Sequence, residues 1–310
     1  MILTVTLNTA LDLTYAVPAL VPHSSHRVSE VTERPGGKGV NVARVLSALG
    51  HDTVVTGFAG GSTGTVLREL LGALPHGPTD ALVTVAGNTR RTLAVVDRSS
   101  GDTTQLNEPG PHIGAGEWAA FLGTFGGLLP RAEAVALCGS LPPGVHVGAY
   151  AELVRLARSA GVPVLLDTGG EPLRRGIAAR PDLVKPNAEE LAQLTGAREP
   201  LRATRDARRR GAHSVVTSLG PDGLLAVTPD GIWRAAPPAA VRGNPTGAGD
   251  SAVAGLLSAL AEGLGWQDRL ARAVALSTAT VLAPAAGEFD REAYEDLLPR
   301  VAVEQHTPAA

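Results

Sequence analysis

Gly36-Gly37-Lys38-Gly39 and Gly247-Ala248-Gly249 are two glycine clusters that each open a long segment of apolar residues at helical spacing. A glycine-rich turn before a helix presents unpaired backbone N–H groups and the positive end of the helix dipole, which together bind phosphate oxygens. Asp250 follows the second cluster directly, where its charge repels a bound anion, so we interpret it as a proton acceptor. The pattern indicates phosphoryl transfer to a hydroxyl group. The plain alternative is a helix-start acid stabilised by the dipole.

Strand-like and helix-like segments alternate around these clusters, which predicts an α/β fold with a doubly wound, mainly parallel sheet flanked by helices. Strands are expected at residues 2–7, 53–58, 93–97, 134–137, 162–167, 183–185, 214–218 and 224–227. Helices are expected at residues 40–49, 64–71, 118–122, 150–160, 188–195, 201–209, 250–261 and 267–282. Such sheets bind ligands at the carboxyl ends of their strands, so we expect one crevice there.

Two stretches, residues 11–32 and 88–108, break the alternation because each contains successive β segments with no helix between them. Such excursions usually pack on each other, so we expect a small β lid that covers the site or clasps a second copy. We expect a single domain over residues 1–310, a homodimer, and a frayed tail at residues 301–310.

Composition argues against several partners. The net charge of −3 gives no global field for nucleic acid or for an anionic membrane. No apolar run approaches the ~20 residues of a spanning helix, and the strand-like N-terminus lacks a basic leader, so we expect a cytoplasmic protein. The single cysteine, Cys138, excludes an internal disulfide and is expected to be buried at a strand end.

Lysine is rare in this chain, since only Lys38 and Lys185 accompany 25 arginines among the 27 basic residues. Both lysines fall in segments that are expected to form the site. An ammonium group is a compact point charge, whereas a guanidinium is a planar fork. We infer that lysine is kept where the fork does not fit.

Seven motifs in order resemble the ribokinase-like, phosphofructokinase-B family of carbohydrate kinases. They are residues 6–12 (TLNTALD), 36–43 (GGKGVNVA), 88–90 (NTR), 139–144 (GSLPPG), 185–190 (KPNAEE), 217–223 (TSLGPDG) and 244–250 (NPTGAGD). The Gly-Lys-Gly-Val-Asn form and the Asn-Glu-Pro-Gly at residues 107–110 are most similar to the branch of 1-phosphofructokinases and tagatose-6-phosphate kinases.

The resemblance implies roles in catalysis and sugar binding. Asp250 is expected to be the general base on the sugar hydroxyl, and the amides of Gly247, Ala248 and Gly249 are expected to form an anion hole. The sugar is expected to contact Asp12, Gly37, Asn41, Ser140 and Asp250 itself. The plain alternative for Asp12 is a turn acid that follows the first strand.

The resemblance also implies ATP and Mg²⁺. Nucleotide contacts are expected from Lys185, Asn187, Ser218, Gly220, Gly223 and Gly249. Asn187 and Glu190 share one helical face, and their hard oxygens suit Mg²⁺ bound through water. A polar pair that only starts a helix is the alternative, and residues 220–223 also make a good hairpin turn.

A second anion, the phosphate already on the substrate, is expected to meet Arg27, Lys38 and Arg90. Each of these side chains alone would also suit a solvated surface. If the lids of two subunits interlock, Arg27 is expected to come from the neighbour.

These expectations define an ATP- and Mg²⁺-dependent kinase that makes a bisphosphate from fructose 1-phosphate. Tagatose 6-phosphate or fructose 6-phosphate, or an unphosphorylated sugar or nucleoside, are alternative substrates. A catalytically silent sugar-binding protein is the non-enzyme alternative. Many relatives carry an acid that helps hold a monovalent cation where Asn244-Pro245 stands here, so the sequence leaves potassium dependence open.

Overall fold

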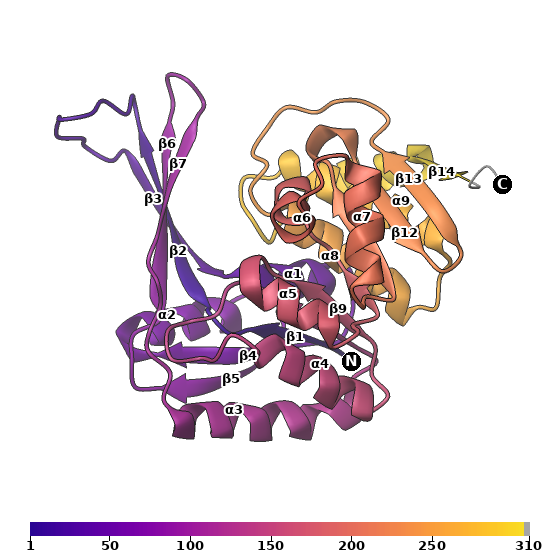
Figure 1. Ribbon diagram of the computed structural model, residues 1–310. Coiled ribbons are helices and arrows are strands. Elements are labelled where there is room, and N and C mark those ends of the chain that lie inside the picture. The colour runs from indigo at the N-terminus through magenta and orange to yellow at the C-terminus, as the bar shows by residue number, and fades with distance from the viewer. Residues whose placement is uncertain (307–310) are drawn as a thin grey trace.

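The computed structural model describes residues 1–306 as a large sheet covered by helices, with a smaller sheet that projects from it (Figure 1). The large sheet has the strand order β14-β13-β12-β11-β10-β9-β8-β1-β4-β5. Its bounds are β1 (Ile2–Thr6), β4 (Thr53–Gly60), β5 (Thr79–Val85), β8 (Ala134–Cys138), β9 (Val164–Asp167), β10 (Leu183–Val184), β11 (Ser214–Ser218), β12 (Leu224–Thr228), β13 (Gly231–Ala236) and β14 (Ala302–His306). In this spatial order, all neighbouring strands between β11 and β5 pair parallel. The strands β12, β13 and β14 pair antiparallel, β12 with β11, β13 with β12 and β14 with β13. The sheet is therefore mainly parallel, as predicted.

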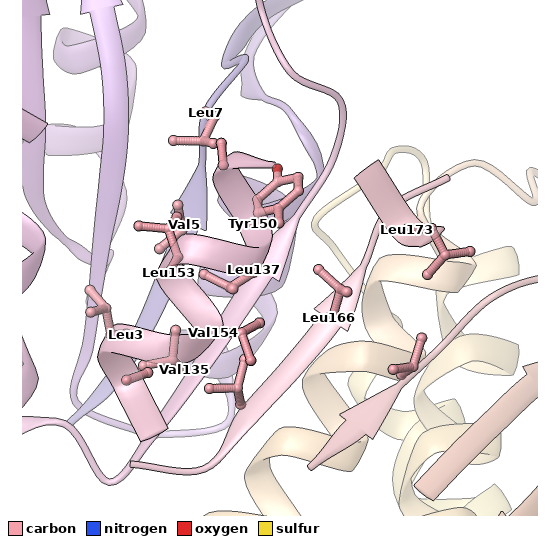
Figure 2. Packing of buried hydrophobic residues seen from close by; sticks show 14 of the residues in the cluster. Leu3, Val5, Leu7, Val135, Leu137, Tyr150, Leu153, Val154, Leu166 and Leu173 are labelled. Carbon is pink, nitrogen blue, oxygen red and sulfur yellow. The ribbon is translucent and has the colours of Figure 1, made fainter. Parts of the chain in front are cut away.

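Helices cover both faces of this sheet because successive side chains of its central strands point to opposite faces and are apolar on both. Ile2 and Cys138 face one core, whereas Leu3 and Leu137 face the other. Figure 2 shows the second core, in which Leu153 and Val154 of α4 belong to the same cluster as Val135 and Leu137 of β8. The helices are α1 (Lys38–Ala48), α2 (Gly61–Gly72), α3 (Ala115–Leu128), α4 (Ala149–Ser159), α5 (Gly170–Ala178), α6 (Ala188–Thr195), α7 (Pro200–Arg209), α8 (Ala248–Ala261), α9 (Trp266–Val281) and α10 (Arg291–Leu297). Cys138 is fully buried at the end of β8, as the sequence predicted.

The smaller sheet forms from the two excursions and confirms the β lid. It joins β3 (Glu30–Gly36), β2 (Ala10–Val17), β6 (Arg90–Asp97) and β7 (Thr103–Asn107) in that order. The two central strands are parallel and each outer strand is antiparallel to its neighbour. In Figure 1 this sheet stands away from the helices as a narrow extension.

The expected frayed tail is wrong for residues 302–306. These residues form β14, which pairs antiparallel with β13 from Ala236↔Ala302 to Ile232↔His306. Alternating apolar side chains explain the difference, because Val301 and Val303 pack against a buried core. The remainder of the expected tail, residues 307–310, lies outside the described residues.

Several elements were missing from the predicted pattern. They are the strands β5 and β13 and the helices α5 and α10. The strand β5 is an edge strand whose outer residues are exposed, so it lacks the continuous apolar run of a central parallel strand. The helix α10 is only seven residues long, which is too short for a helical period of apolar residues to be recognised in the sequence.

The described residues contain no helix that is both long enough and apolar enough to cross a bilayer.

Candidate active site

The predicted catalytic residue, Asp250, lies in the first turn of α8 and is 7% exposed. The helix begins after Gly247, whose φ of 84° is a left-handed conformation that favours glycine. A Cβ on Gly247 would also lie 2.7 Å from Ala286 Cα, so close packing requires glycine there as well. Within this turn the Ala248 N–H donates to the Pro245 carbonyl at 3.2 Å, so of the three amides predicted to form an anion hole it is already engaged, and those of Gly247 and Gly249 are the better candidates.

Asp250 accepts a hydrogen bond from Asn41, with 2.8 Å between Asn41 Nδ2 and Asp250 Oδ2. Burial raises the pKa of Asp250 to about 6, while Lys38 and the bond from Asn41 act in the opposite direction. A carboxyl with this pKa is ionised at neutral pH and is a stronger base than an exposed aspartate. The sequence suggested that Asn41 contacts the sugar, and the structure adds this contact with the base.

Three of the residues expected to contact the sugar, Gly37, Asn41 and Asp12, lie at the first glycine cluster. Gly37 caps α1 with a φ of 98°, and Asn41 follows one turn later. Asp12, from β2, packs against Gly36, where a Cβ would lie 2.0 Å from Asp12 Oδ2. Burial raises the pKa of Asp12 to about 6, with Arg90 acting in the opposite direction. The second glycine of the cluster is thus a helix cap, and the first makes room for a carboxylate.

Both lysines meet a carboxylate that the sequence analysis did not identify as part of the site. Asp167, the last residue of β9, is 1% exposed. Its Oδ2 lies 3.3 Å from Lys38 Nζ, and its Oδ1 lies 3.4 Å from Lys185 Nζ. The lysine charges hold the pKa of Asp167 below its usual value against the opposing effect of burial. An acid at the carboxyl end of a buried predicted strand was the available signal.

Arg90 and Ser140 line one cavity of about 610 Å³ together with Asn8. Asn8 Nδ2 donates to Ser140 Oγ at 3.1 Å, and Arg90 Nε donates to the Asn8 carbonyl at 3.3 Å. The guanidinium and the hydroxyl are therefore arranged around the same asparagine. This arrangement suits an anionic group such as a phosphate monoester.

The three cations expected around the substrate phosphate do not meet within one chain. Lys38 pairs with Asp167, and the other acids that act on its charge are Asp250 and Glu190. The acids that act on Arg90 are Asp12 and Glu108. Arg27 lies exposed in the connection between β2 and β3. Lys38 thus lies with Asp167 and Asp250, the predicted base, whereas Arg90 lies near Ser140.

The expected nucleotide residues meet in a second cavity of about 610 Å³. Its lining includes Asn187, Ser218, Gly220, Gly223 and Gly249. Lys185 approaches the same glycine, because a Cβ on Gly249 would lie 3.6 Å from Lys185 Nζ. The wall of this cavity also contains Pro237, residues 240–243, and Ser277, Thr278 and Val281 of α9, none of which the sequence marked as binding residues. These residues follow no recognisable binding motif, and only the fold brings them beside β11.

Asn187 and Glu190 form a reciprocal capping box at the start of α6. Asn187 Oδ1 accepts from the Glu190 N–H at 2.8 Å, and Glu190 Oε2 accepts from the Asn187 N–H at 2.8 Å. The helix-start alternative is therefore present in the structure. Glu190 Oε1 has no hydrogen-bond partner among the described residues and is left for another ligand.

No cluster of three or more His, Cys, Asp and Glu side chains that could hold a metal occurs within residues 1–306. Asn187 lines the nucleotide-side cavity, and the Glu190 carboxylate beside it has the oxygen chemistry that suits Mg²⁺, which keeps several waters and often binds through nucleotide phosphates.

The geometry defines a class of protein. A buried carboxylate at a glycine-rich helix N-terminus, two lysines whose charges act on it, and a cavity lined by the same helix start are the parts expected of a phosphotransferase that acts on a hydroxyl. The pattern of the pfkB family carbohydrate kinases matches residues 4–292. The chain belongs to this family, which confirms the resemblance seen in its motifs.

Individual phosphofructokinases are similar to this chain over nearly its whole length. A 1-phosphofructokinase of Rhodobacter capsulatus is 39% identical over 291 residues, which are 91% of this chain and 92% of that protein. The structure of a possible 1-phosphofructokinase from Thermotoga maritima has a TM-score of 0.90 at 29% identity, covering 99% of this chain and 100% of that one. Phosphofructokinase-2 from Escherichia coli in complex with fructose-6-phosphate has a TM-score of 0.86 at 29% identity, covering 96% and 98%.

Proposed function

We propose that this protein transfers the γ-phosphoryl group of ATP to a hydroxyl of fructose 1-phosphate and forms fructose 1,6-bisphosphate. The observation that carries the proposal is the placement of buried Asp250 at the N-terminus of α8, between the nucleotide-side cavity and the residues of α1. The similarity to a 1-phosphofructokinase favours the 1-phosphate over the 6-phosphate of the same or a related sugar. Tagatose 6-phosphate and fructose 6-phosphate are the alternatives within the same class.

In this mechanism Asp250 accepts the proton of the attacking hydroxyl through the carboxylate that Asn41 orients. The hydroxyl oxygen forms a bond to the γ-phosphorus, the bond from that phosphorus to the β-phosphate oxygen breaks, and ADP leaves. The N–H groups of Gly247 and Gly249 and the ammonium groups of the two lysines stabilise the charge on the transferred group, whereas the Ala248 N–H must first leave the Pro245 carbonyl to take part.

Asp12 and Asn41 are proposed to hold the sugar hydroxyls, with Gly37 leaving room for them. Arg90 and Ser140 are proposed to bind the substrate's own phosphate. Mg²⁺, which neutralises nucleotide phosphate charge when bound, is proposed to be held near Glu190 and Asn187 through water.

We also propose that the protein is a cytoplasmic homodimer joined through its lid sheets. The lid leaves large apolar side chains in water, with Val21 52%, Val31 57% and Leu106 58% exposed. A second copy packed there would cover them and would bring its Arg27 toward the first copy's substrate phosphate.

A substrate panel tests the proposed reaction. Purified protein with Mg²⁺ and ATP should give the highest kcat/KM with fructose 1-phosphate, when compared with tagatose 6-phosphate, fructose 6-phosphate and free fructose. Arg90→Met should raise KM for the hexose phosphates about tenfold or more, because a charge-assisted bond contributes ~1.5–3 kcal/mol. The same variant should change KM for free fructose little. Equal loss with both kinds of substrate would reject Arg90 as the phosphate contact.

A further inference from the structure

One carboxylate holds both lysines of this chain at the reaction centre. Asp167 places one ammonium group near each of its oxygens, at 3.3 Å and 3.4 Å. Lys38 comes from the N-terminus of α1 on the sugar side, whereas Lys185 follows β10 and approaches Gly249 on the nucleotide side. The backbone supports this pairing, because Lys185 N donates to the Leu166 carbonyl at 3.0 Å. The carboxylate is thus fixed between two elements that would contact different substrates.

Asp250 is a competing acid for the same lysines. The charges that face it are Lys38 from α1, Asp167 from β9 and Lys185 after β10, with the Cys138 thiol at the end of β8. A lysine that paired directly with Asp250 would stabilise its ionised form and would occupy the oxygen that must take the proton. Asn41 already uses Asp250 Oδ2, so little of the base would remain free.

We propose that Asp167 is a positioning residue that holds Lys38 and Lys185 beside the transferred phosphoryl group and away from Asp250. The inference rests on the proposed function, because it assigns the lysines to that phosphoryl group. Two fixed ammonium groups need no reorganisation when charge develops between them. Asp167 itself contacts neither substrate, since it is 1% exposed beneath the lysines.

The primary test is Asp167→Asn, alone and in a Lys38→Met background. We expect the single variant to lower kcat ~10²-fold and to move the acid limb of the kcat/KM profile to lower pH. Loss of the Asp167 charge lowers the pKa of Asp250 by itself, so the pH shift alone does not separate the two routes. The double-mutant cycle does separate them. In the Lys38→Met background, Asp167→Asn should cost less than about tenfold, and an equal cost in both backgrounds would overturn the proposal.

Asp182→Asn is the matched control, because Asp182 accepts a hydrogen bond from the Val164 N–H at the opposite end of β9. It should lower stability without moving the pH limb. If Asp167→Asn fails to fold, Asp167→Asn with Lys185→Met removes the buried charge pair together and leaves half-exposed Lys38 as the free lysine. In that background Lys38→Met should cost less than it costs the wild type, and an equal cost in both would contradict the proposal.

Titration of the Asp250 carboxyl by ¹³C NMR needs no substrate and separates this inference from the proposed function. Asp167→Asn should lower the Asp250 pKa more in the wild-type background than in the Lys38→Met background. Equal shifts would overturn the positioning role, even if fructose 1-phosphate were a good substrate. Failure to phosphorylate fructose 1-phosphate would reject the proposed function and leave the titration result standing. A higher Mg²⁺ requirement with no coupling to Lys38 would instead assign Asp167 to the metal.

Discussion

At the scale of single residues, Asp250 combines its proposed role as the catalytic base with an environment that disfavours its charge. The helix N-terminus favours its charge, but burial dominates and raises its pKa to about 6. The same burial that strengthens the base therefore makes its ionised form costly in the folded state.

Removal of the base should stop turnover without removing the site. Asp250→Asn preserves shape and the neighbouring Asn41, so we expect kcat to fall ~10²–10⁴-fold with ATP affinity nearly unchanged. Steady-state kinetics and ATP titration calorimetry measure the two quantities. Near-normal turnover would show that Asp250 is not the base.

The pH dependence of stability has a sign that can be checked. The pKa of Asp250 is raised from 3.8 to about 6, so the folded protein holds a proton that the unfolded chain loses between these values. Wild-type stability therefore falls relative to Asp250→Asn as the pH rises through this window. Denaturant unfolding at pH 8 should find the variant more stable by about 1–3 kcal/mol, with the difference shrinking toward pH 4. A variant that is less stable at pH 8 would contradict the raised pKa.

At the scale of elements, Lys38 and Asp250 sit at helix starts and Asp167 at a strand end, whereas Asp12 lies within β2. Many of these helix starts and strand ends can be predicted from the sequence. The glycine clusters indicate the starts of α1 and α8, and apolar runs indicate β8, β9 and β11. Asp250, Asn41 and the nucleotide-side glycines were predictable for that reason. The pairing of Lys38 with Asp167 was not, because strand order decides which strand ends become neighbours. The cavity wall that contains Pro237 and residues 240–243 depends on tertiary packing in the same way.

The capping box at α6 lets the metal role be separated from the structural one. Glu190→Gln keeps an oxygen that accepts the Asn187 N–H, so α6 should remain capped. The lost charge should raise the Mg²⁺ concentration for half-maximal rate several-fold while KM for the hexose phosphate stays the same. A magnesium titration at saturating sugar measures the effect. An unchanged titration would leave Glu190 with only its capping role.

At the scale of the whole molecule, the lid sheet is the part that a single chain leaves incomplete. Its outer strand β7 is exposed along its length, and the connection carrying Arg27 extends into solvent. The sequence predicted this sheet from two stretches without helices, but sequence alone could not show which of its apolar residues remain uncovered. Those residues provide the test of the proposed dimer.

Charges placed on the lid should separate the subunits. Val31→Glu with Leu106→Glu removes apolar contacts worth ~1.5–3 kcal/mol per side chain, so the dimer dissociation constant should rise about 10²-fold or more. Leu156→Glu, on α4 and 39% exposed, is the matched control and should leave the dimer intact. Sedimentation equilibrium measures both. A wild-type protein that is monomeric at micromolar concentration would reject the clasp.

The most direct test of the central claim is to identify the product by ³¹P NMR. Wild-type protein, Mg²⁺, ATP and fructose 1-phosphate should yield ADP and a sugar with two phosphate monoester resonances, in equal amounts, and Asp250→Asn should yield neither at a comparable rate. ADP formation with only inorganic phosphate as its partner, or a bisphosphate that appears as fast with Asp250→Asn as with the wild type, would contradict phosphoryl transfer to the sugar by this site.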